Sequence, residues 1–317
     1  MARVTGMPRV SSALDLLDLT PDEANGFFAT EDAERVVGLV DALTDRELAR
    51  LVDVPHLRTS AVRHVLGRLG EFALPEPLAE VEGVVEFRVD VPQGPSEVHL
   101  LAFDGEGVAA APAGMQPDVT ISLAALDFVR MVSGGRNAAL LLLGDRLRVD
   151  GDEQLALRVG GVFRVPGRPG VAVGPSAVDP EQAALVLKGV KDRHLDRLMS
   201  GGFREVVLDQ VFTRLPEFLD AQRAADASLA VAFRIDGRPD GGSDRVTVYV
   251  NRGSCRAERD ADGDRDATLV LGGAQFLKLV TGHLNPVSGV VRGALKVKGD
   301  LNAALTLYRI MRIPGRG

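Results

Sequence analysis

The spacing of apolar residues changes from helical to alternating twice along this chain, and the two changes predict two similar sets of elements. Apolar residues recur at helical spacing up to Phe72, and they do so again over residues 181–199. The stretches TPDE from residue 20 and TDRE from residue 44 have the spacing of capping boxes, in which a threonine and a glutamate satisfy free amides at a helix start. Each half of the chain is therefore predicted to begin with helices.

Alternating apolar and polar residues follow each helical region and predict short strands joined by turns that contain glycine and proline. The strands expected in the first half are residues 84–89, 97–103, 107–112 and 118–122, and those in the second half are residues 228–235, 245–250, 254–259 and 266–270. One amphipathic helix should follow each set, with Gly134 or Gly282 in a left-handed C-cap. A fifth strand then ends in Gly-Asp, where the glycine permits a turn and Asp152 or Asp300 caps a closing helix.

The two halves of the chain are copies of one plan. Residues 118–167 align with residues 266–315 without a gap, and 16 of the 50 pairs are identical. Such a duplication predicts two tandem domains of one fold. Helices, a mostly antiparallel sheet and further helices make that fold α+β. The expected organisation is an N-terminal segment (1–25), a more divergent first domain (26–166), a linker rich in proline and glycine (167–179) and a second domain (180–317).

Amino-acid composition indicates the class of protein and the compartment in which it is expected. The chain has 317 residues, of which 45% are hydrophobic and 26% charged, which is typical of a globular protein. No apolar run approaches the ~20 residues of a transmembrane helix, and the first residues lack the pattern of a secretory signal. The single cysteine, Cys255, fits a reducing compartment and is interpreted as a small strand residue rather than a nucleophile. We therefore expect a cytoplasmic protein, and the abundance of Ala, Arg, Gly and Val is typical of a GC-rich bacterial genome.

Net charge and aromatic content indicate which classes of binding partner are unfavourable. A formal net charge of −7 disfavours nucleic acid, because affinity for phosphate backbones comes mostly from clustered Lys and Arg. The chain has no tryptophan and two tyrosines, which leaves few aromatic platforms for stacking on bases. We expect instead a partner that is bound by aliphatic side chains.

Several motifs at fixed spacing fall within residues 266–305. An acidic residue precedes a short strand, a helix carries Phe-Leu-x-Leu-Val-x-Gly, and Leu-Asn-Pro and Gly-x-Leu-Lys-Val-x-Gly-Asp follow in that order. This series resembles the sterol carrier protein 2 family of lipid-binding domains, over most of residues 185–313 and less strongly over about 30–165. The resemblance implies a sheet covered by helices, with an apolar tunnel between them that holds sterols, fatty acyl chains or other lipids. It implies no cofactor.

The resemblance also implies, by position, which apolar residues contact the ligand. In the second domain these residues are Phe276, Leu277, Val280, Leu284, Val287, Val290 and, on the closing helix, Leu305. In the first domain they are Phe128, Val129 and Val132. The first domain departs from the pattern, because Arg136 stands at the position of Leu284 and Ala138 at that of Pro286. We also expect the glycine pair 160–161 to interrupt its closing helix, at about 1 kcal/mol for each glycine.

One acidic segment has the spacing of a metal site. Asp260, Asp262 and Asp264 are placed like the start of a calcium loop, but Arg265 and Leu271 stand where that loop needs glycine and glutamate. The segment is therefore interpreted as a solvated hairpin turn.

Catalytic motifs are missing from the sequence. It contains no G-x-S-x-G, no G-x-x-x-x-G-K and no H-E-x-x-H, and its five histidines are scattered, so we expect no catalytic residues, no metal ligands and no enzyme. His283, beside the expected tunnel mouth, is a candidate contact for the polar end of a ligand. The leading hypothesis is non-catalytic binding or transfer of a hydrophobic, lipid-like small molecule. The alternatives are a structural or regulatory interaction module with filled cavities, and an accessory protein to a lipid- or natural-product-metabolising enzyme.

Overall fold

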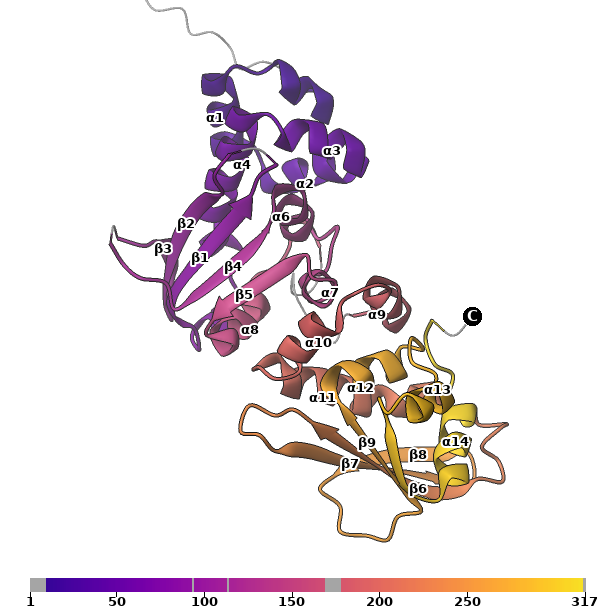
Figure 1. Ribbon diagram of the computed structural model, residues 1–317. Helices are drawn as coiled ribbons and strands as arrows, with labels where there is room; N and C mark the ends of the chain where they lie inside the picture. Colours follow the sequence, from indigo (N-terminus) through magenta and orange to yellow (C-terminus); the bar gives the residue numbers. More distant parts are fainter. Residues whose placement is uncertain (1–9, 93, 113, 169–177, 316–317) are drawn as a thin grey trace, which may run out of the picture. The chain divides into compact units, whose positions relative to one another are not determined.

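A computed structural model describes residues 10–92, 94–112, 114–168 and 178–315 (Figure 1). The chain divides into two compact units, Met1–Gly174 and Pro175–Gly317, which are described here one at a time as unit 1 and unit 2. Most of the predicted linker, residues 169–177, lies outside the described residues.

Unit 1 begins with a layer of short helices. They are η1 (Ala13–Asp18), α1 (Pro21–Thr30), α2 (Ala33–Asp41), α3 (Asp45–Val52), α4 (Pro55–Gly67), η2 (Leu69–Phe72) and α5 (Pro75–Leu78). The two predicted capping boxes are confirmed. The backbone N–H of Thr20 donates to Glu23 Oε2 at 2.9 Å, and that of Thr44 donates to Glu47 Oε2 at 2.8 Å.

Five strands follow in unit 1 and form one sheet. They are β1 (Glu82–Asp90), β2 (Glu97–Asp104), β3 (Val108–Ala110), β4 (Val119–Ala124) and β5 (Leu147–Gly151), in the spatial order β3-β2-β1-β4-β5. The β1 and β4 strands run parallel, and the other pairs are antiparallel. The remaining helices are α6 (Ala125–Val132), α7 (Ala138–Leu143) and α8 (Glu153–Val162). The α8 helix runs through Gly160 and Gly161, so the prediction that these glycines interrupt it is wrong.

Unit 2 repeats this arrangement. Its helices are α9 (Pro180–Leu187), α10 (Asp192–Leu198), α11 (Phe203–Arg214), η4 (Leu215–Phe218), α12 (Gly273–Val280), α13 (Pro286–Val291) and α14 (Leu301–Ile310). Its strands are β6 (Ser228–Asp236), β7 (Ser243–Asn251), β8 (Ser254–Arg259), β9 (Ala267–Gly272) and β10 (Lys296–Gly299), in the order β10-β9-β6-β7-β8. Again one pair, β6 with β9, is parallel. The predicted α+β fold with a mostly antiparallel sheet is confirmed for both halves.

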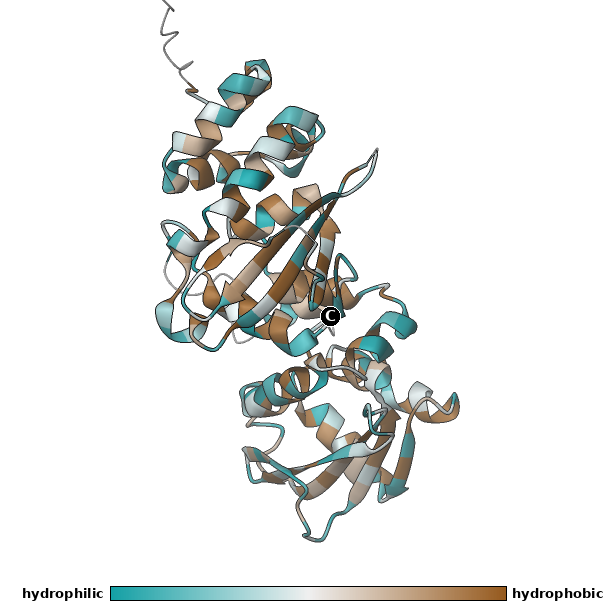
Figure 2. Cartoon of the chain, turned by 90° about the vertical axis from the view of Figure 1, so that its left-hand side faces the viewer, coloured by the Kyte–Doolittle hydropathy of each residue, from teal (hydrophilic) through white to brown (hydrophobic). Residues whose placement is uncertain are grey.

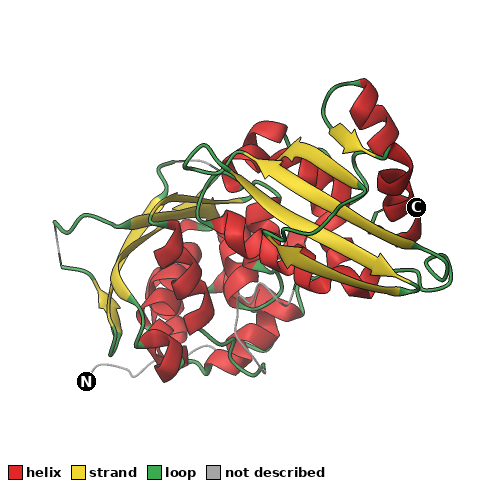
Figure 3. Ribbon diagram, turned by 90° about the horizontal axis from the view of Figure 1, so that it is seen from below, coloured by secondary structure: helices red, strands yellow, loops and turns green. Residues whose placement is uncertain are grey.

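Helices gather on one face of each sheet (Figure 3). On β6, Val231, Phe233 and Ile235 are buried on the helix-covered face, while Arg234 between them is only partly buried. This alternation is the period-two pattern of the sequence. In Figure 2 the strands and the helices packed on them carry much of the apolar colour, and many connecting loops are hydrophilic.

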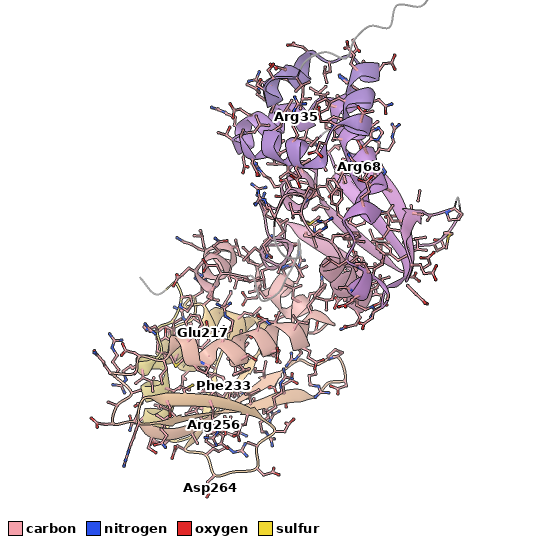
Figure 4. All side chains as sticks on the ribbon, turned by 180° about the vertical axis from the view of Figure 1, so that it is seen from behind. Arg35, Arg68, Glu217, Phe233, Arg256 and Asp264 are labelled. Atoms are coloured by element: carbon pink, nitrogen blue, oxygen red, sulfur yellow. The ribbon has the colours of Figure 1, made fainter. Side chains whose placement is uncertain are left out.

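The acidic loop of unit 2 is not a hairpin. It leaves β8 at the edge of the sheet and enters β9, and β7 and β6 lie between these two strands. The loop that carries Asp264 (Figure 4) is therefore a crossover connection, which corrects the predicted hairpin turn.

One junction explains why an aspartate and a Gly-Asp pair recur in both halves. In unit 1 the Asp118 carboxylate accepts the Val84 N–H at 2.7 Å, and the Asp118 carbonyl accepts the Asp152 N–H at 2.9 Å. Gly151 has φ +108°, and a Cβ there would collide with the Asp118 carbonyl oxygen. The same contacts recur in unit 2 with Asp266, Ala230, Asp300 and Gly299.

Candidate ligand-binding site

The centre of unit 2, between the sheet and its helices, is filled by three aromatic rings. Phe276 on α12 stacks on Phe212 of α11 at 5.4 Å between ring centroids, and both meet Phe233 of β6 edge to face at 6.2 and 5.7 Å. Figure 4 labels Phe233 on the side of the sheet that faces the helices. Phe276 is fully buried and Leu277 nearly so. The structure therefore places these two predicted ligand contacts inside the packed core.

The other predicted contacts of unit 2 lie at one margin of that core. Val280, Leu284, Val290 and Leu305 are partly buried, and so is Val297 of β10. Val287 is 56% exposed. We call this set the apolar rim, and its members are Val280, Leu284, Val287, Val290, Val297 and Leu305.

The rim is held together at the edge of the sheet. The α12 and α14 helices pack against β9, and α13 and α14 pack against β10. Leu284 lies against α13, because its Cδ1 atom is 3.4 Å from the place that a Cβ on Gly289 would take. Asn285 caps α13 by accepting the Val287 N–H at 3.0 Å. Aliphatic side chains from three helices and a strand therefore border one partly open margin.

The corresponding margin of unit 1 is charged. Phe128 is buried like its counterpart, and Val129 and Val132 are partly buried. Beside them, the almost fully buried Asp127 pairs with Arg136, which stands at the position of Leu284.

Two further arginines complete this network. Arg146 donates to Asp127 Oδ1 at 2.6 Å, and Arg136 reaches Asp45 as well. The buried Arg130 donates to Asp45 Oδ1 at 2.9 Å and to the carbonyls of Val40 and Leu43 at 3.0 and 2.6 Å. The network ties α6 to the N-terminal helices of unit 1. Asp127 and Arg130 are the buried charges of the network, and a buried charge is stable only when it has a partner.

Arg136 is the one member of this network that the sequence motifs singled out. Two further positions distinguish the charge of the units, because Asp127 and Arg146 stand where unit 2 has Gln275 and Ala294. Arg130 aligns with another cation, Lys278, which pairs with Asp192 of α10. Comparing charge at every aligned position of the duplication is the signal that leads to this network.

In each unit an arginine joins a helix that precedes the sheet to the sheet itself. Arg58 of α4 donates to Glu97 of β2 at 2.7 Å, and Arg204 of α11 donates to Asp244 of β7 at 2.5 Å. In unit 1, His99 lies next to Glu97, and its Nε2 atom is buried without a hydrogen-bond partner among the described residues. Burial lowers the pKa of His99, against the opposite effect of the Glu97 carboxylate.

A hollow of about 510 Å³ opens elsewhere on unit 2. It lies between α10 and the start of α12, and its lining includes Arg193, Arg197, Asp196 and Asp236. Four of its nine lining residues are charged, and we do not assign the apolar ligand to this hollow.

A metal site, a reactive cysteine and a membrane-spanning helix each require features that can be sought in the structure. Over the described ranges of the chain, no group of three His, Cys, Asp or Glu side chains is placed to hold a metal ion. Burial raises the pKa of the Cys255 thiol on β8, which makes this cysteine a poor nucleophile. His283 is exposed, and its Nε2 lies 2.6 Å from the Ala184 carbonyl oxygen. Within the part of the chain that is described, no helix has the length and apolar character needed to cross a membrane.

Comparison with known proteins decides the family. A sequence profile of the SCP-2 sterol transfer family matches residues 64–164 and 208–312, which together make up more than half of the chain. This chain belongs to the SCP-2 sterol transfer family. The two matched regions confirm the resemblance seen in the sequence and the presence of two copies. Membership in the SCP-2 family supports lipid or sterol binding or transfer as the general function.

Individual relatives match over one copy. Sterol carrier protein 2 of Arabidopsis thaliana is 31% identical over 101 residues, which are 30% of this chain and 82% of that protein. Sterol carrier protein 2 of Homo sapiens is 31% identical over 84 residues, so the match spans 26% of this chain and only 15% of the human protein. The solved structure of sterol carrier protein 2 from Yarrowia lipolytica, in its apo form, is 22% identical, covers 34% of this chain and 91% of its own, and has a TM-score of 0.29.

Proposed function

We propose that this protein binds a hydrophobic, lipid-like small molecule non-covalently at the apolar rim of unit 2 and carries it without chemical change. The observation that carries the proposal is the contrast at one aligned position. Leu284 belongs to a margin of aliphatic side chains, whereas Arg136 in unit 1 is paired with two aspartates. Family membership supports the class of ligand.

Desolvation would drive the binding. Val280, Val290 and Leu305 are only partly buried, so an apolar molecule placed against them removes apolar surface from water on both sides. Such burial contributes about 25 cal/mol for each Å² removed from water. Binding in an enclosed tunnel would need movement at the rim, since the Phe276 cluster occupies the centre of the unit. The α14 helix would form part of the wall.

Unit 1 does not offer the same margin to an apolar ligand. Placing a lipid beside Asp127 and Arg136 would remove water from an ionic network without replacing its polar contacts, which costs free energy. We infer one ligand for each chain, held by unit 2. We also propose that the protein acts in the cytoplasm and has no catalytic activity of its own.

Native mass spectrometry of the full chain after incubation with a lipid extract tests the proposal. The wild type should retain one lipid mass, and Leu284→Arg, which copies the residue of unit 1, should reduce retention at least tenfold. Val98→Arg is the matched control, because it adds the same charge at an exposed apolar position of unit 1 and should leave retention unchanged. Equal retention by Leu284→Arg and the wild type would show that the rim does not hold the ligand.

The aromatic packing favours a second candidate function. If Phe212, Phe233 and Phe276 keep the interior closed under all conditions, the protein serves as a structural or regulatory interaction module, with or without a partner enzyme. That function predicts no retained lipid mass under conditions that load a known carrier, together with a stable protein partner on purification from the native cell.

A further inference from the structure

One edge of unit 2 exposes apolar side chains. Val287 and Val291 are four residues apart, share one face of α13, and are 56% and 82% exposed. Leu301, at the start of α14, is 46% exposed. Both helices pack against β10, so these three side chains gather near this edge strand. Apolar groups grouped at a surface mark an interaction site more often than single ones do.

Basic side chains share the same edge. Arg292 follows α13, and Lys296 and Lys298 alternate along β10 with the partly buried Val297. All three cations are exposed, and the structure records no ion pair for them among the residues that it describes. We call the six residues together the β10 edge surface: Val287, Val291, Arg292, Lys296, Lys298 and Leu301.

The aligned segment of unit 1 has the opposite charge. Residues 286–301 carry three cations and one carboxylate, and residues 138–153 carry two cations and four carboxylates. In unit 1 the positions of Val287 and Leu301 hold Ala139 and Glu153. The apolar and basic character is therefore particular to unit 2 and is not a requirement of the shared fold.

The outer face of the sheet extends the basic character beyond the edge strand. Strand register places Lys296, Val270, Arg234 and Arg245 in one row across the face that points away from the helices, and Arg234 also pairs with Asp236 at 3.0 Å. Arg234 and Arg245 stand directly opposite each other, and like charges placed in this way weaken strand pairing. The corresponding row of unit 1 carries two cations and ends on Val98.

We propose that the β10 edge surface docks unit 2 on an anionic lipid bilayer. The valine and leucine side chains enter the interfacial region, and the lysine and arginine stems lie along it with their charges at the headgroups. The one carboxylate of the segment, Asp300, caps α14 by accepting the Asn302 N–H at 2.7 Å. Charge complementarity thus favours a negatively charged surface, and the aliphatic side chains favour lipid.

Docking on a bilayer would let the protein load or release its ligand at a membrane. This role of the docking rests on the proposed carrier function. Leu284 and Val290 of the apolar rim adjoin the β10 edge surface through α13. A bound ligand would therefore leave the rim next to the bilayer rather than through water.

Cosedimentation of the full chain with vesicles tests the docking. The wild type should bind phosphatidylcholine vesicles that contain one quarter phosphatidylglycerol, bind pure phosphatidylcholine vesicles far more weakly, and lose binding as salt is raised. The triple variant Arg292→Gln/Lys296→Gln/Lys298→Gln should bind the anionic vesicles on the order of a hundredfold more weakly, since each basic residue near such a surface contributes about fivefold. Val287→Ser/Val291→Ser should weaken binding about tenfold.

The matched control is Arg46→Gln/Arg50→Gln/Arg158→Gln, which removes three exposed cations from unit 1 and should bind like the wild type. Wild-type binding by both β10 edge variants, or no binding by the wild type, would overturn the docking, and in the second case a captured acidic protein would identify a different partner. Retention of a lipid mass is measured separately. A chain that retains lipid without binding vesicles refutes the docking alone, and one that binds vesicles without retaining lipid refutes the carrier function alone.

Discussion

Unit 1 and unit 2 share one fold but differ in the side chains at the margin of the sheet, which are charged in unit 1 and apolar in unit 2. In unit 2 the position after the central helix holds Leu284, which packs against Gly289 of α13. In unit 1 it holds Arg136, paired with Asp127 and Asp45. The fold does not require either choice, because Gly134 and Gly282 end the two helices with nearly the same backbone angle, φ +75° and +78°. The difference therefore concerns what each margin can bind.

The interiors differ as well. Unit 2 packs Phe212, Phe233 and Phe276 at its centre. Both units tie the central helix to an N-terminal helix by an ion pair, Arg130 with Asp45 in unit 1 and Lys278 with Asp192 in unit 2. In unit 1 that ion pair is extended by the buried Asp127 with Arg136 and Arg146, whereas the aligned positions of unit 2, all among the described residues, carry no such network. Substitutions at aligned positions should separate these two contributions.

The largest expected effect comes from the aromatic cluster. Phe276→Ala removes a fully buried ring and should lower the free energy of unfolding of unit 2 by about 3 to 5 kcal/mol. Hydrogen exchange on the full chain should show protection lost in β6 and β9, with the peptides of unit 1 unchanged. Phe128→Ala is the counterpart and should loosen unit 1 instead. Loss of protection in unit 1 after the Phe276→Ala substitution would contradict the expectation that this aromatic cluster stabilises unit 2 alone.

The ionic network should give the next largest effect. Asp127→Ala leaves Arg136 without one partner and should destabilise unit 1 by about 2 kcal/mol, as measured by urea unfolding. Gln275→Ala, at the aligned position of unit 2, should change stability by no more than about 0.5 kcal/mol. Equal effects would mean that the network adds nothing to unit 1.

A smaller effect of opposite sign is expected on the outer face of the sheet in unit 2. Thr247 is fully buried, and its hydroxyl oxygen has no hydrogen-bond partner within the described parts of the chain. Leu100 occupies the equivalent place in unit 1, next to β1. Thr247→Val keeps the shape and removes the unpaired hydroxyl, so it should stabilise unit 2 by about 1 kcal/mol in the same urea experiment. A loss of stability would show that the hydroxyl has a partner in solution.

The smallest effect concerns acid stability. Burial lowers the pKa of His99 in the folded state, so the unfolded state takes up the proton first as pH falls through the ordinary value of about 6.5. Unit 1 should therefore lose stability below neutral pH. His99→Val, which copies Val246 of unit 2, should reduce this loss. Part should remain, because burial also lowers the pKa of His64. If the variant lost stability with falling pH just as the wild type does, protonation of His99 would not contribute to the acid sensitivity of unit 1.

Much of the fold could be predicted from the sequence, because its local signals are strong. The capping boxes at Thr20 and Thr44, the left-handed glycines and the Asp300 cap are short-range patterns, and the structure confirms each of them. The parallel pairing inside each sheet and the crossover after β8 are long-range features, and alternation of residues does not distinguish them from a run of hairpins.

The candidate site could be predicted less completely. Apolar character alone does not separate Phe276, which is sealed among aromatic rings, from Leu284 at the margin, because both occur on amphipathic segments. The network around Asp127 depends on contacts between residues about 90 positions apart. The ligand contacts of the rim remain a prediction.

Photo-crosslinking of the full chain with a diazirine-bearing long-chain fatty acid tests the central claim most directly. Crosslinked peptides are expected from residues 280–305, which carry the apolar rim, and they should be lost in Leu284→Arg. Crosslinks concentrated in residues 132–157, the aligned margin of unit 1, would contradict it.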